Sequence, residues 1–151
     1  MKNTTLCYIE KDGAYLMLHR VKKENDLNKD KWIGIGGKFL ENESPDECLL
    51  REVKEETGLT LTDYKLRAVI TFVSDQCEGE YMYLYTATGF IGDIIECDEG
   101  ELEWVDKTEV MKLPTWEGDR LFLEKIYDGS EFFMLKLVYE GDKLVDAKWS
   151  K

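Results

Sequence analysis

The stretch that decides the fold runs from Gly37 to Leu59 and reads GKFLENESPDECLLREVKEETGL. It carries the signals for both ends of one helix. Ser44 can cap the first turn, Pro45 suits the first helical position, and Glu47 can complete a capping box. Gly58 can adopt the left-handed conformation that ends a helix. The stretch therefore predicts a helix of about three to four turns between two loops.

Three glutamates lie close together on this predicted helix. Glu52, Glu55 and Glu56 are spaced i, i+3 and i+4, so their carboxylates share one face. Like charges at this spacing repel one another unless a cation neutralises them. Carboxylate oxygens suit Mg²⁺ or Mn²⁺, and carboxylates together with substrate phosphates are the usual magnesium arrangement. The alternative interpretation is a solvated acidic face, relieved by Lys54 and by an Arg51–Glu55 pair.

The spacing of the whole stretch favours the metal-binding interpretation. The order of its positions is Gly37, five residues, Glu43, seven residues, Arg51-Glu52-Val53, one residue, Glu55-Glu56, one residue, Gly58-Leu59. This pattern matches the Nudix box at every fixed position, so the chain resembles the Nudix hydrolases. The resemblance implies a loop–helix–loop that holds divalent metal against a nucleoside diphosphate linkage. It also implies an α/β fold, a Nudix-type α/β/α sandwich with a mixed β-sheet, as a single domain over residues 1–151.

The composition fits one globular domain. The 151 residues are 43% hydrophobic and 12% aromatic, which suits a substantial core. The formal net charge of −12 argues against binding to nucleic acid or to an anionic membrane, because both need basic surface. The sequence shows no apolar run of membrane-helix length and no signal peptide. Its four cysteines form no CxxC pair and predict reduced thiols in the cytoplasm.

Apolar and alternating segments predict several strands and a second helix. Strands are expected over residues 4–10, 14–20, 64–73, 80–90, 102–105, 132–139 and 143–149. Turns at 11–13, 75–79 and 140–142 predict hairpins between neighbouring strands. Residues 22–31 read as a polar loop that leads into the glycine-rich segment 32–37. Residues 116–127 have helical spacing, and Gly129 is expected to end this second helix.

The family resemblance assigns roles to the residues of the box. Glu52 and Glu56 would be the principal metal ligands. Glu55 would assist them, and the carbonyl oxygen of Gly36 would complete the coordination sphere. Arg51 would orient the glutamates rather than contact substrate, since its guanidinium can pair with a carboxylate through two hydrogen bonds. Divalent ions held there, either Mg²⁺ or Mn²⁺, would neutralise the phosphates and lower the pKa of a bound water.

Residues outside the box complete the expected site. Similar Nudix enzymes place a glutamate of the acidic loop at the metal, and Glu99 is the candidate, with an ordinary solvated turn as the alternative. Glu52, Glu56 or Glu99 could take the proton of the attacking water, and the sequence leaves this choice open. Arg20 and Lys38 are candidate contacts to the phosphates, although either could equally be a surface charge.

Two further segments indicate a substrate. Residues 31–38 (KWIGIGGK) and 114–119 (PTWEGD) look like the MutT-type branch, which hydrolyses oxidised purine nucleoside triphosphates such as 8-oxo-dGTP to the monophosphate and pyrophosphate. Glycines such as Gly37 let the main chain approach a ligand closely. Trp116 would stack on the purine, and Asp119 would hydrogen-bond the base edge, so that an unmatched base leaves the carboxylate unpaired. A core role for Trp116 and a helix-dipole role for Asp119 are equally open.

Two positions depart from that branch. Ile33 stands where the mammalian-type enzymes carry a base-reading asparagine, and Gly118 where they carry the first of two adjacent aspartates. These departures concern the base and leave hydrolysis of the phosphate chain unaffected. Two other functions stay open: a Nudix pyrophosphatase for ADP-ribose, nucleotide sugars or dinucleoside polyphosphates, and a nucleotide-binding sensor domain without turnover. We expect the protein to be a monomer or a homodimer. We expect it to bind a small nucleotide substrate and neither nucleic acid nor a membrane.

Overall fold

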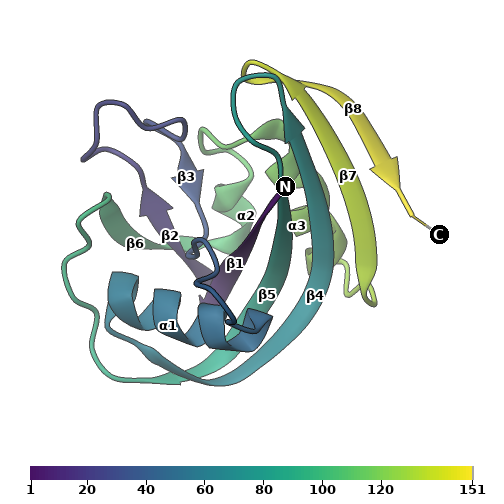
Figure 1. Ribbon diagram of the computed structural model, residues 1–151. Helices are drawn as coiled ribbons and strands as arrows, with labels where there is room; N and C mark the ends of the chain where they lie inside the picture. The colour runs from purple at the N-terminus through teal and green to yellow at the C-terminus, as the bar shows by residue number, and fades with distance from the viewer. Residues whose placement is uncertain (151) are drawn as a thin grey trace.

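The computed structural model describes residues 1–150 and shows a mixed sheet between helices (Figure 1). The elements in chain order are β1 (Lys2–Lys11), β2 (Ala14–His19), β3 (Trp32–Ile33), α1 (Pro45–Thr57), β4 (Thr60–Ser74), β5 (Glu80–Ile91), β6 (Glu101–Asp106), α2 (Lys107–Val110), α3 (Glu117–Tyr127), β7 (Phe133–Glu140) and β8 (Lys143–Trp149). The predicted α/β/α sandwich with a mixed sheet is confirmed. Lys151, the last residue of the predicted domain, lies outside the described residues.

The strands form two groups that share the β1–β2 hairpin. Strands β1, β5, β4, β7 and β8 lie side by side in that order, while β2 pairs with β1, β3 and β6. The three predicted hairpins are confirmed by the antiparallel pairs β1–β2, β4–β5 and β7–β8. The pairs β1–β5 and β4–β7 are parallel, and each joins segments far apart in sequence. Local sequence patterns cannot predict such pairings, because the residues of one strand do not specify which distant strand it pairs with.

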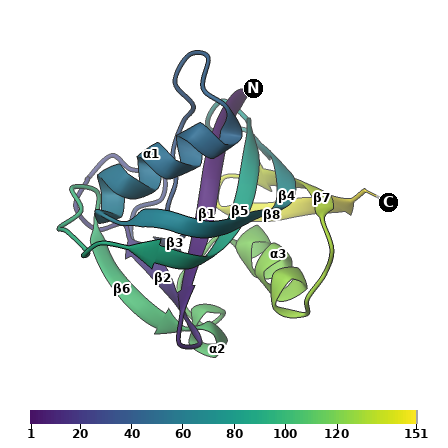
Figure 2. The same cartoon turned by 90° about the horizontal axis from the view of Figure 1, so that it is seen from below.

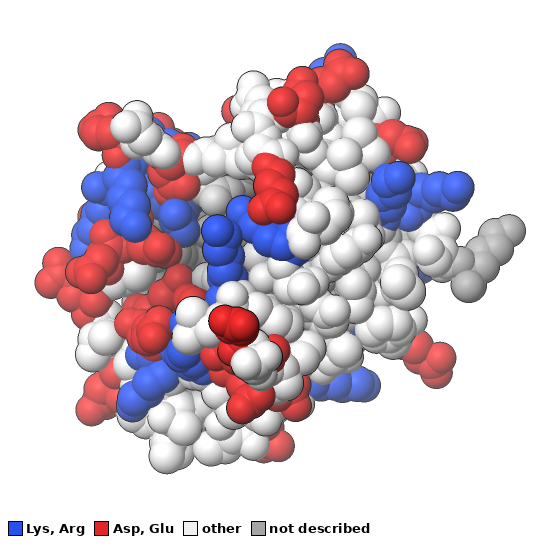
Figure 3. Space-filling view, in the orientation of Figure 1, with Lys and Arg blue, Asp and Glu red and all other residues white. Residues whose placement is uncertain are grey.

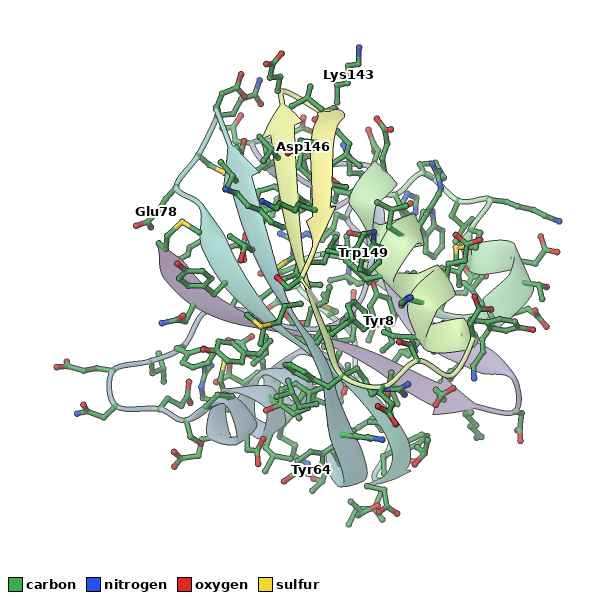
Figure 4. All side chains as sticks on the ribbon, turned by 90° about the vertical axis from the view of Figure 1, so that its right-hand side faces the viewer. Tyr8, Tyr64, Glu78, Lys143, Asp146 and Trp149 are labelled. Carbon is green, nitrogen blue, oxygen red and sulfur yellow. The ribbon has the colours of Figure 1, made fainter. Side chains whose placement is uncertain are left out.

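Helices α1 and α3 lie on opposite faces of the sheet (Figure 2). Each covers its own apolar cluster. The cluster under α1 includes Ile9, Leu16, Leu18, Ile35, Leu49, Val53 and Tyr85. The cluster under α3 includes Tyr8, Ile70, Leu84, Trp116, Phe122, Leu135 and Leu137. The side-chain view shows Tyr8 close to α3 and Trp149 beside the same helix (Figure 4), where the Tyr8 and Phe122 ring centres are 6.2 Å apart. The sheet therefore separates two cores, one for each helix.

Helix α1 begins and ends as its sequence predicts. The Ser44 hydroxyl accepts a hydrogen bond from the Glu47 N–H at 3.1 Å, and the Glu47 carboxylate accepts one from the Ser44 N–H at 3.0 Å. Gly58 has φ of 82° and donates its N–H to the Lys54 carbonyl at 2.9 Å. N-cap hydrogen bonds of this kind contribute about 1 kcal/mol. The helix is thus held at both ends by residues of the stretch that contains it.

The structure differs from the expected elements mainly at boundaries and in short segments. β4 begins at Thr60, four residues earlier than expected, and Trp116 is the N-cap of α3 rather than its first residue. The sequence did not predict β3, which is two residues long, or α2, which is a single turn. The first turn of α2 does have a local signal, because the Asp106 carboxylate accepts a hydrogen bond from the Thr108 N–H at 2.9 Å. Among residues 1–150, no helix has the length and apolar character needed to cross a bilayer.

Candidate active site

The glycine-rich loop before α1 lies directly against β1. The Gly37 carbonyl accepts a hydrogen bond from the Thr5 N–H at 2.9 Å. A Cβ atom on Gly36 would lie 1.8 Å from the Thr5 carbonyl oxygen, and one on Gly37 would lie 2.6 Å from the carboxylate carbon of Glu52. Any larger residue would push the loop away from the strand and from the helix. The absence of side chains therefore brings this backbone up to the glutamates of α1.

Glu56 turns into the protein from α1. Its Oε2 atom is buried and has no hydrogen-bond partner among residues 1–150. Burial is the largest influence that raises the pKa of this carboxyl well above its ordinary value. The negative charges of Glu99 and Glu52 raise the pKa further, whereas a backbone contact at Gly36 lowers it. A buried acceptor without a partner is costly, and a bound cation is one way to satisfy it.

Arg51 holds the other acidic residues of the helix and its loop. Its Nε and Nη2 atoms donate to the two oxygens of Glu43 at 2.7 and 3.0 Å, and this pairing lowers the pKa of Glu43 to about 2. Its Nη1 atom donates to Glu52 at 2.7 Å and to Glu55 at 3.2 Å. Nη2 also donates to the Lys38 carbonyl at 2.9 Å. Glu55 is 60% exposed and Glu52 only 15%, so the three helical glutamates have different environments.

Glu99 reaches the same region from the loop between β5 and β6. Its Oε2 atom accepts a hydrogen bond from Arg20 Nη1 at 3.0 Å, and its Oε1 atom lies 3.6 Å from Lys23 Nζ. Arg20 also donates from Nε to Asp26 at 2.6 Å. From the sequence and the family resemblance, Arg20 was a candidate contact to the phosphates and Glu99 a candidate metal ligand. The structure brings the two side chains together, and both roles stay predictions.

The carboxylates fit a divalent cation in chemistry but are not gathered as a finished cage. Within the described part of the chain, no three His, Cys, Asp or Glu side chains surround a common point. Arg51 holds Glu52 and Arg20 holds Glu99, and the negative charges of both carboxylates act on Glu56. The unpartnered oxygen of Glu56 and the mutual repulsion of the three acids are what a cation would relieve. Hard oxygen ligands of this kind suit Mg²⁺ or Mn²⁺.

A cavity of about 360 Å³ opens between the glycine-rich loop and α3. Its volume falls in the usual range of small-molecule sites, about 300–1,000 Å³. All of the residues predicted to contact substrate line this one cavity: Arg20, Ile33, Gly37, Lys38, Trp116 and Asp119. Charged side chains of both signs crowd the left half of the molecule, whereas the surface over β4 and β7 is largely uncharged (Figure 3). The tertiary structure thus joins segments that are separated by almost a hundred residues.

Trp116 belongs both to the core and to the cavity wall. It is only 6% exposed, and its ring meets the rings of Phe72 and Tyr139 edge-on at 5.8 and 5.1 Å between centres. Its Nε1–H donates to the Asn28 side-chain oxygen at 2.6 Å, and Lys31 Nζ lies 4.5 Å from the ring centre. The two interpretations of this residue are therefore compatible, because a core tryptophan forms part of the wall.

Asp119 is a buried carboxyl at the cavity wall. Burial raises its pKa to about 7, and the charges of Arg120 and Lys31 only partly oppose this increase. Its negative charge contributes to raising the pKa of the buried Tyr8 and Tyr139 hydroxyls. A carboxyl that titrates near neutral pH can act as a hydrogen-bond donor when protonated and as an acceptor when ionised. Asp119 can therefore pair with either kind of group on a ligand.

The two departures from the MutT-type pattern have structural reasons. Ile33 lies in β3 opposite Leu18 and gives the cavity an apolar contact. Gly118 packs against β7, where its N–H donates to the Tyr139 hydroxyl at 2.8 Å. A Cβ atom on Gly118 would lie 2.5 Å from a methyl group of Leu137 and 2.6 Å from the Tyr139 oxygen. A second aspartate therefore has no room at this position.

Sequence reasoning missed several residues of this region. Asn28 and Asp26 lie in a loop that the sequence describes only as polar, and nothing local marks their contacts with Trp116 and Arg20. Phe72 also lines the cavity. The alternation of Ala68, Ile70 and Phe72 along β4 is a signal that could have placed Phe72 on an inward face.

Comparison with known proteins now identifies the family. The family model for the Nudix domain matches residues 2–126. The chain belongs to the Nudix hydrolase family. An uncharacterised Nudix hydrolase of Bacillus subtilis is 28% identical over 85% of this chain and 81% of its own length. The oxidized purine nucleoside triphosphate hydrolase of Danio rerio is 26% identical over 97% of this chain and 93% of its own.

Solved structures of MutT proteins share the fold of this Nudix hydrolase. The crystal structure of a MutT protein from Bacillus halodurans has a TM-score of 0.88, covers 99% of this chain and 98% of its own, and is 24% identical. A MutT Nudix hydrolase from Burkholderia pseudomallei has a TM-score of 0.70, covers 83% of this chain and 97% of its own, and is 25% identical. The predicted resemblance is confirmed. Nudix hydrolases generally use divalent metals and act on small nucleotide substrates.

Proposed function

We propose that this Nudix hydrolase splits purine nucleoside triphosphates, oxidised forms such as 8-oxo-dGTP among them, into the monophosphate and pyrophosphate with Mg²⁺ or Mn²⁺. The observation that supports it most directly is a cavity lined by Gly37 and Lys38 at one end and by Trp116 and Asp119 at the other. The α1 glutamates do not line it, but Glu52 packs against Gly37 at the first end, which is called the acidic end for that reason. A nucleotide lying along it would have its phosphates at the acidic end and its base at the aromatic end. The zebrafish relative's name supports the same substrate class.

At the phosphate end, the acidic residues would hold the divalent ion and the basic ones the phosphates. Glu52, Glu56 and Glu99 would be its ligands, with the Gly36 carbonyl. A bound divalent ion would neutralise the phosphate oxygens and lower the pKa of a coordinated water. Arg51 would keep Glu52 oriented, because it already binds that carboxylate at 2.7 Å. Lys38 and Arg20 line the cavity and would contact the phosphates. A glutamate left free of the ion would accept the proton of the attacking water.

At the base end, selectivity would rest on one carboxyl and one indole. Asp119 is buried, so a base that cannot pair with it would leave a polar group unsatisfied. The base would stack on the Trp116 ring and replace Lys31, which now lies over that ring. Ile33 and the lack of room at Gly118 support a recognition scheme with a single carboxylate. The same two features favour the second candidate, a pyrophosphatase for ADP-ribose, nucleotide sugars or dinucleoside polyphosphates.

The state of the cysteines supports a proposal for the cellular compartment of the protein. The four cysteines of the chain are all free, and three of them are buried. Free thiols are the usual state in a reducing compartment. We therefore propose a cytoplasmic enzyme, where the nucleotide pool supplies its substrates.

The deciding experiment resolves reaction products by chromatography after incubation with Mg²⁺. The panel contains ordinary and oxidised purine nucleoside triphosphates, pyrimidine triphosphates, ADP-ribose, nucleotide sugars and dinucleoside polyphosphates. We expect monophosphate and pyrophosphate from purine triphosphates, with the highest kcat/KM in the panel. The Glu56→Gln protein serves as the control for contaminating phosphatases. Preferred cleavage of ADP-ribose or a nucleotide sugar would select the second candidate, and no metal-dependent hydrolysis of any compound would reject both.

A further inference from the structure

A chain of hydrogen bonds in the loop between β2 and β3 connects the two ends of the cavity. Arg20 donates from Nη1 to Glu99 at 3.0 Å and from Nε to Asp26 Oδ2 at 2.6 Å. The other oxygen of Asp26 accepts the Asn28 N–H at 3.0 Å. The Asn28 side-chain oxygen then accepts the indole N–H of Trp116 at 2.6 Å. Four bonds therefore link a candidate metal ligand to the aromatic wall of the base end.

Asp26 is the central residue of this chain. Its side chain is 5% exposed and that of Arg20 is 14% exposed, so solvent screens their ion pair only weakly. Asp26 does not line the cavity, and its two oxygens bind different partners, one on a side chain and one on the loop backbone. Burying an ion pair is expensive unless its geometry is good and further hydrogen bonds support it, and here each Asp26 oxygen accepts one hydrogen bond. The position of the guanidinium and the position of Asn28 thus depend on each other.

Backbone hydrogen bonds hold the two ends of the loop. The Asp30 N–H donates to the Arg20 carbonyl at 2.7 Å, and the Arg20 N–H donates to the Lys31 carbonyl at 3.0 Å. Beyond the loop, the Trp32 N–H donates to the Pro114 carbonyl at 2.8 Å, two residues before Trp116. The two ends of the loop are therefore tied to each other and to the segment that carries the indole.

We propose that Asp26 is a positioning residue that couples the two ends of the cavity. A purine against Trp116 fixes the indole and, through Asn28 and Asp26, the guanidinium of Arg20. Glu99 can then leave Arg20 for a divalent ion while the arginine stays in place for a phosphate. A ligand that orders part of a site lowers the entropic cost for the next ligand, so purine binding should strengthen ion binding and the reverse. The inference rests on the proposed function, because it places a purine at the base end.

The test measures ion affinity with and without a purine nucleoside that has no phosphates. Free Mn²⁺ is followed by electron paramagnetic resonance, and guanosine and 8-oxoguanosine are the probes. The dissociation constant of Mn²⁺ should fall about fivefold or more in the wild-type protein at saturating nucleoside, in the usual range of allosteric coupling. In Asp26→Asn the fall should be less than about twofold, because the amide loses the ion pair with Arg20 and its one oxygen cannot accept from both Arg20 and the Asn28 N–H.

A matched control and a second variant make the result decisive. Asp30→Asn removes the same charge from the same loop at an exposed residue with φ of 65°, a conformation that asparagine tolerates, and it should keep the wild-type coupling. Asn28→Ala cuts the chain at Trp116 while leaving the Arg20–Asp26–Glu99 contacts in place. Its coupling should also be lost, and it replaces Asp26→Asn if that protein fails a thermal-unfolding check.

Two results would overturn the proposal: no effect of nucleoside on Mn²⁺ affinity in the wild type, or full coupling retained in Asn28→Ala. Product analysis separates this failure from failure of the proposed function. A wild-type protein that releases pyrophosphate from purine triphosphates but shows no coupling would reject only the role of Asp26. Coupling without turnover of triphosphates would reject the proposed reaction and keep the link between the two ends.

Discussion

The two ends of the cavity differ in how the chain builds them. Beside the acidic end and outside its lining, Glu52, Glu55 and Glu56 come from five consecutive residues of one capped helix. At the aromatic end, Ile33 comes from β3, Phe72 from β4, and Trp116 and Asp119 from the start of α3. Arginines bind Glu52 and Glu99 at the acidic end, while Asp119 is buried among apolar and aromatic side chains at the other. The candidate metal ligands on α1 therefore depend on local spacing, whereas the candidate contacts to the base depend on tertiary packing.

The largest expected effect comes from changing Glu56, beside the acidic end of the cavity. Glu56→Gln should lower kcat by about a hundredfold or more, the usual contribution of a positioned acid or base, with KM changing much less. The fold should stay intact, since the amide has nearly the same shape as the carboxyl and burial already favours the neutral form of Glu56. Steady-state kinetics and thermal unfolding check both statements. Glu55→Gln, at an exposed position, is the control and should lose less activity. A near wild-type rate in Glu56→Gln would remove Glu56 from the reaction.

The next effect concerns the packing behind the aromatic end. Gly118→Ala should lower the free energy of unfolding by about 1–3 kcal/mol, because its Cβ atom would meet Leu137 at 2.5 Å. Urea denaturation measures the change. Combining it with Leu137→Val, which removes the clashing methyl group, should recover part of the loss and give a non-additive pair. Equal stability of Gly118→Ala and wild type would show that the site can hold a larger residue.

The charge of Asp119 should appear in the pH dependence of stability. Its pKa is about 7 in the folded protein and about 3.9 when unfolded, so the folded state binds the proton more tightly. The wild-type protein should therefore lose stability relative to Asp119→Asn as pH rises from about 4 to 7, and the difference should level off above. Each pKa unit corresponds to about 1.4 kcal/mol. Chemical denaturation across this range is the measurement, and parallel curves for the two proteins would contradict the buried, protonated state.

The smallest expected effect is that of Trp116→Phe, which separates the binding role of Trp116 from its role in the core. Trp116→Ala should raise KM for purine substrates. It should also lower the free energy of unfolding by about 3–5 kcal/mol, because the indole packs on Phe72 and Tyr139. Trp116→Phe keeps most of this packing and loses the hydrogen bond to Asn28. We expect a several-fold higher KM for purines, about 1 kcal/mol of binding, with a smaller change in unfolding free energy. An unchanged KM with a large loss of stability would assign the residue to the core alone.

The sequence by itself determined the helix and the acidic end. Capping residues, glycine positions and the i, i+3, i+4 spacing act within one short stretch, so Ser44, Gly58 and the glutamates could be interpreted without knowing their neighbours. The hairpins followed for the same reason, since each joins adjacent strands through a short turn. The residues expected at the substrate came from the family resemblance, and the cavity gathers all of them.

Only the tertiary structure decided how these parts meet. The parallel pairs β1–β5 and β4–β7 bring distant segments together, and no local pattern specifies them. The burial that raises the pKa of Asp119, the pairing of Arg20 with Glu99 and the contact of Asn28 with Trp116 all depend on that assembly. The physical reason is range: hydrogen bonds within a helix or turn join residues a few positions apart, whereas desolvation and packing depend on every segment that closes around a group.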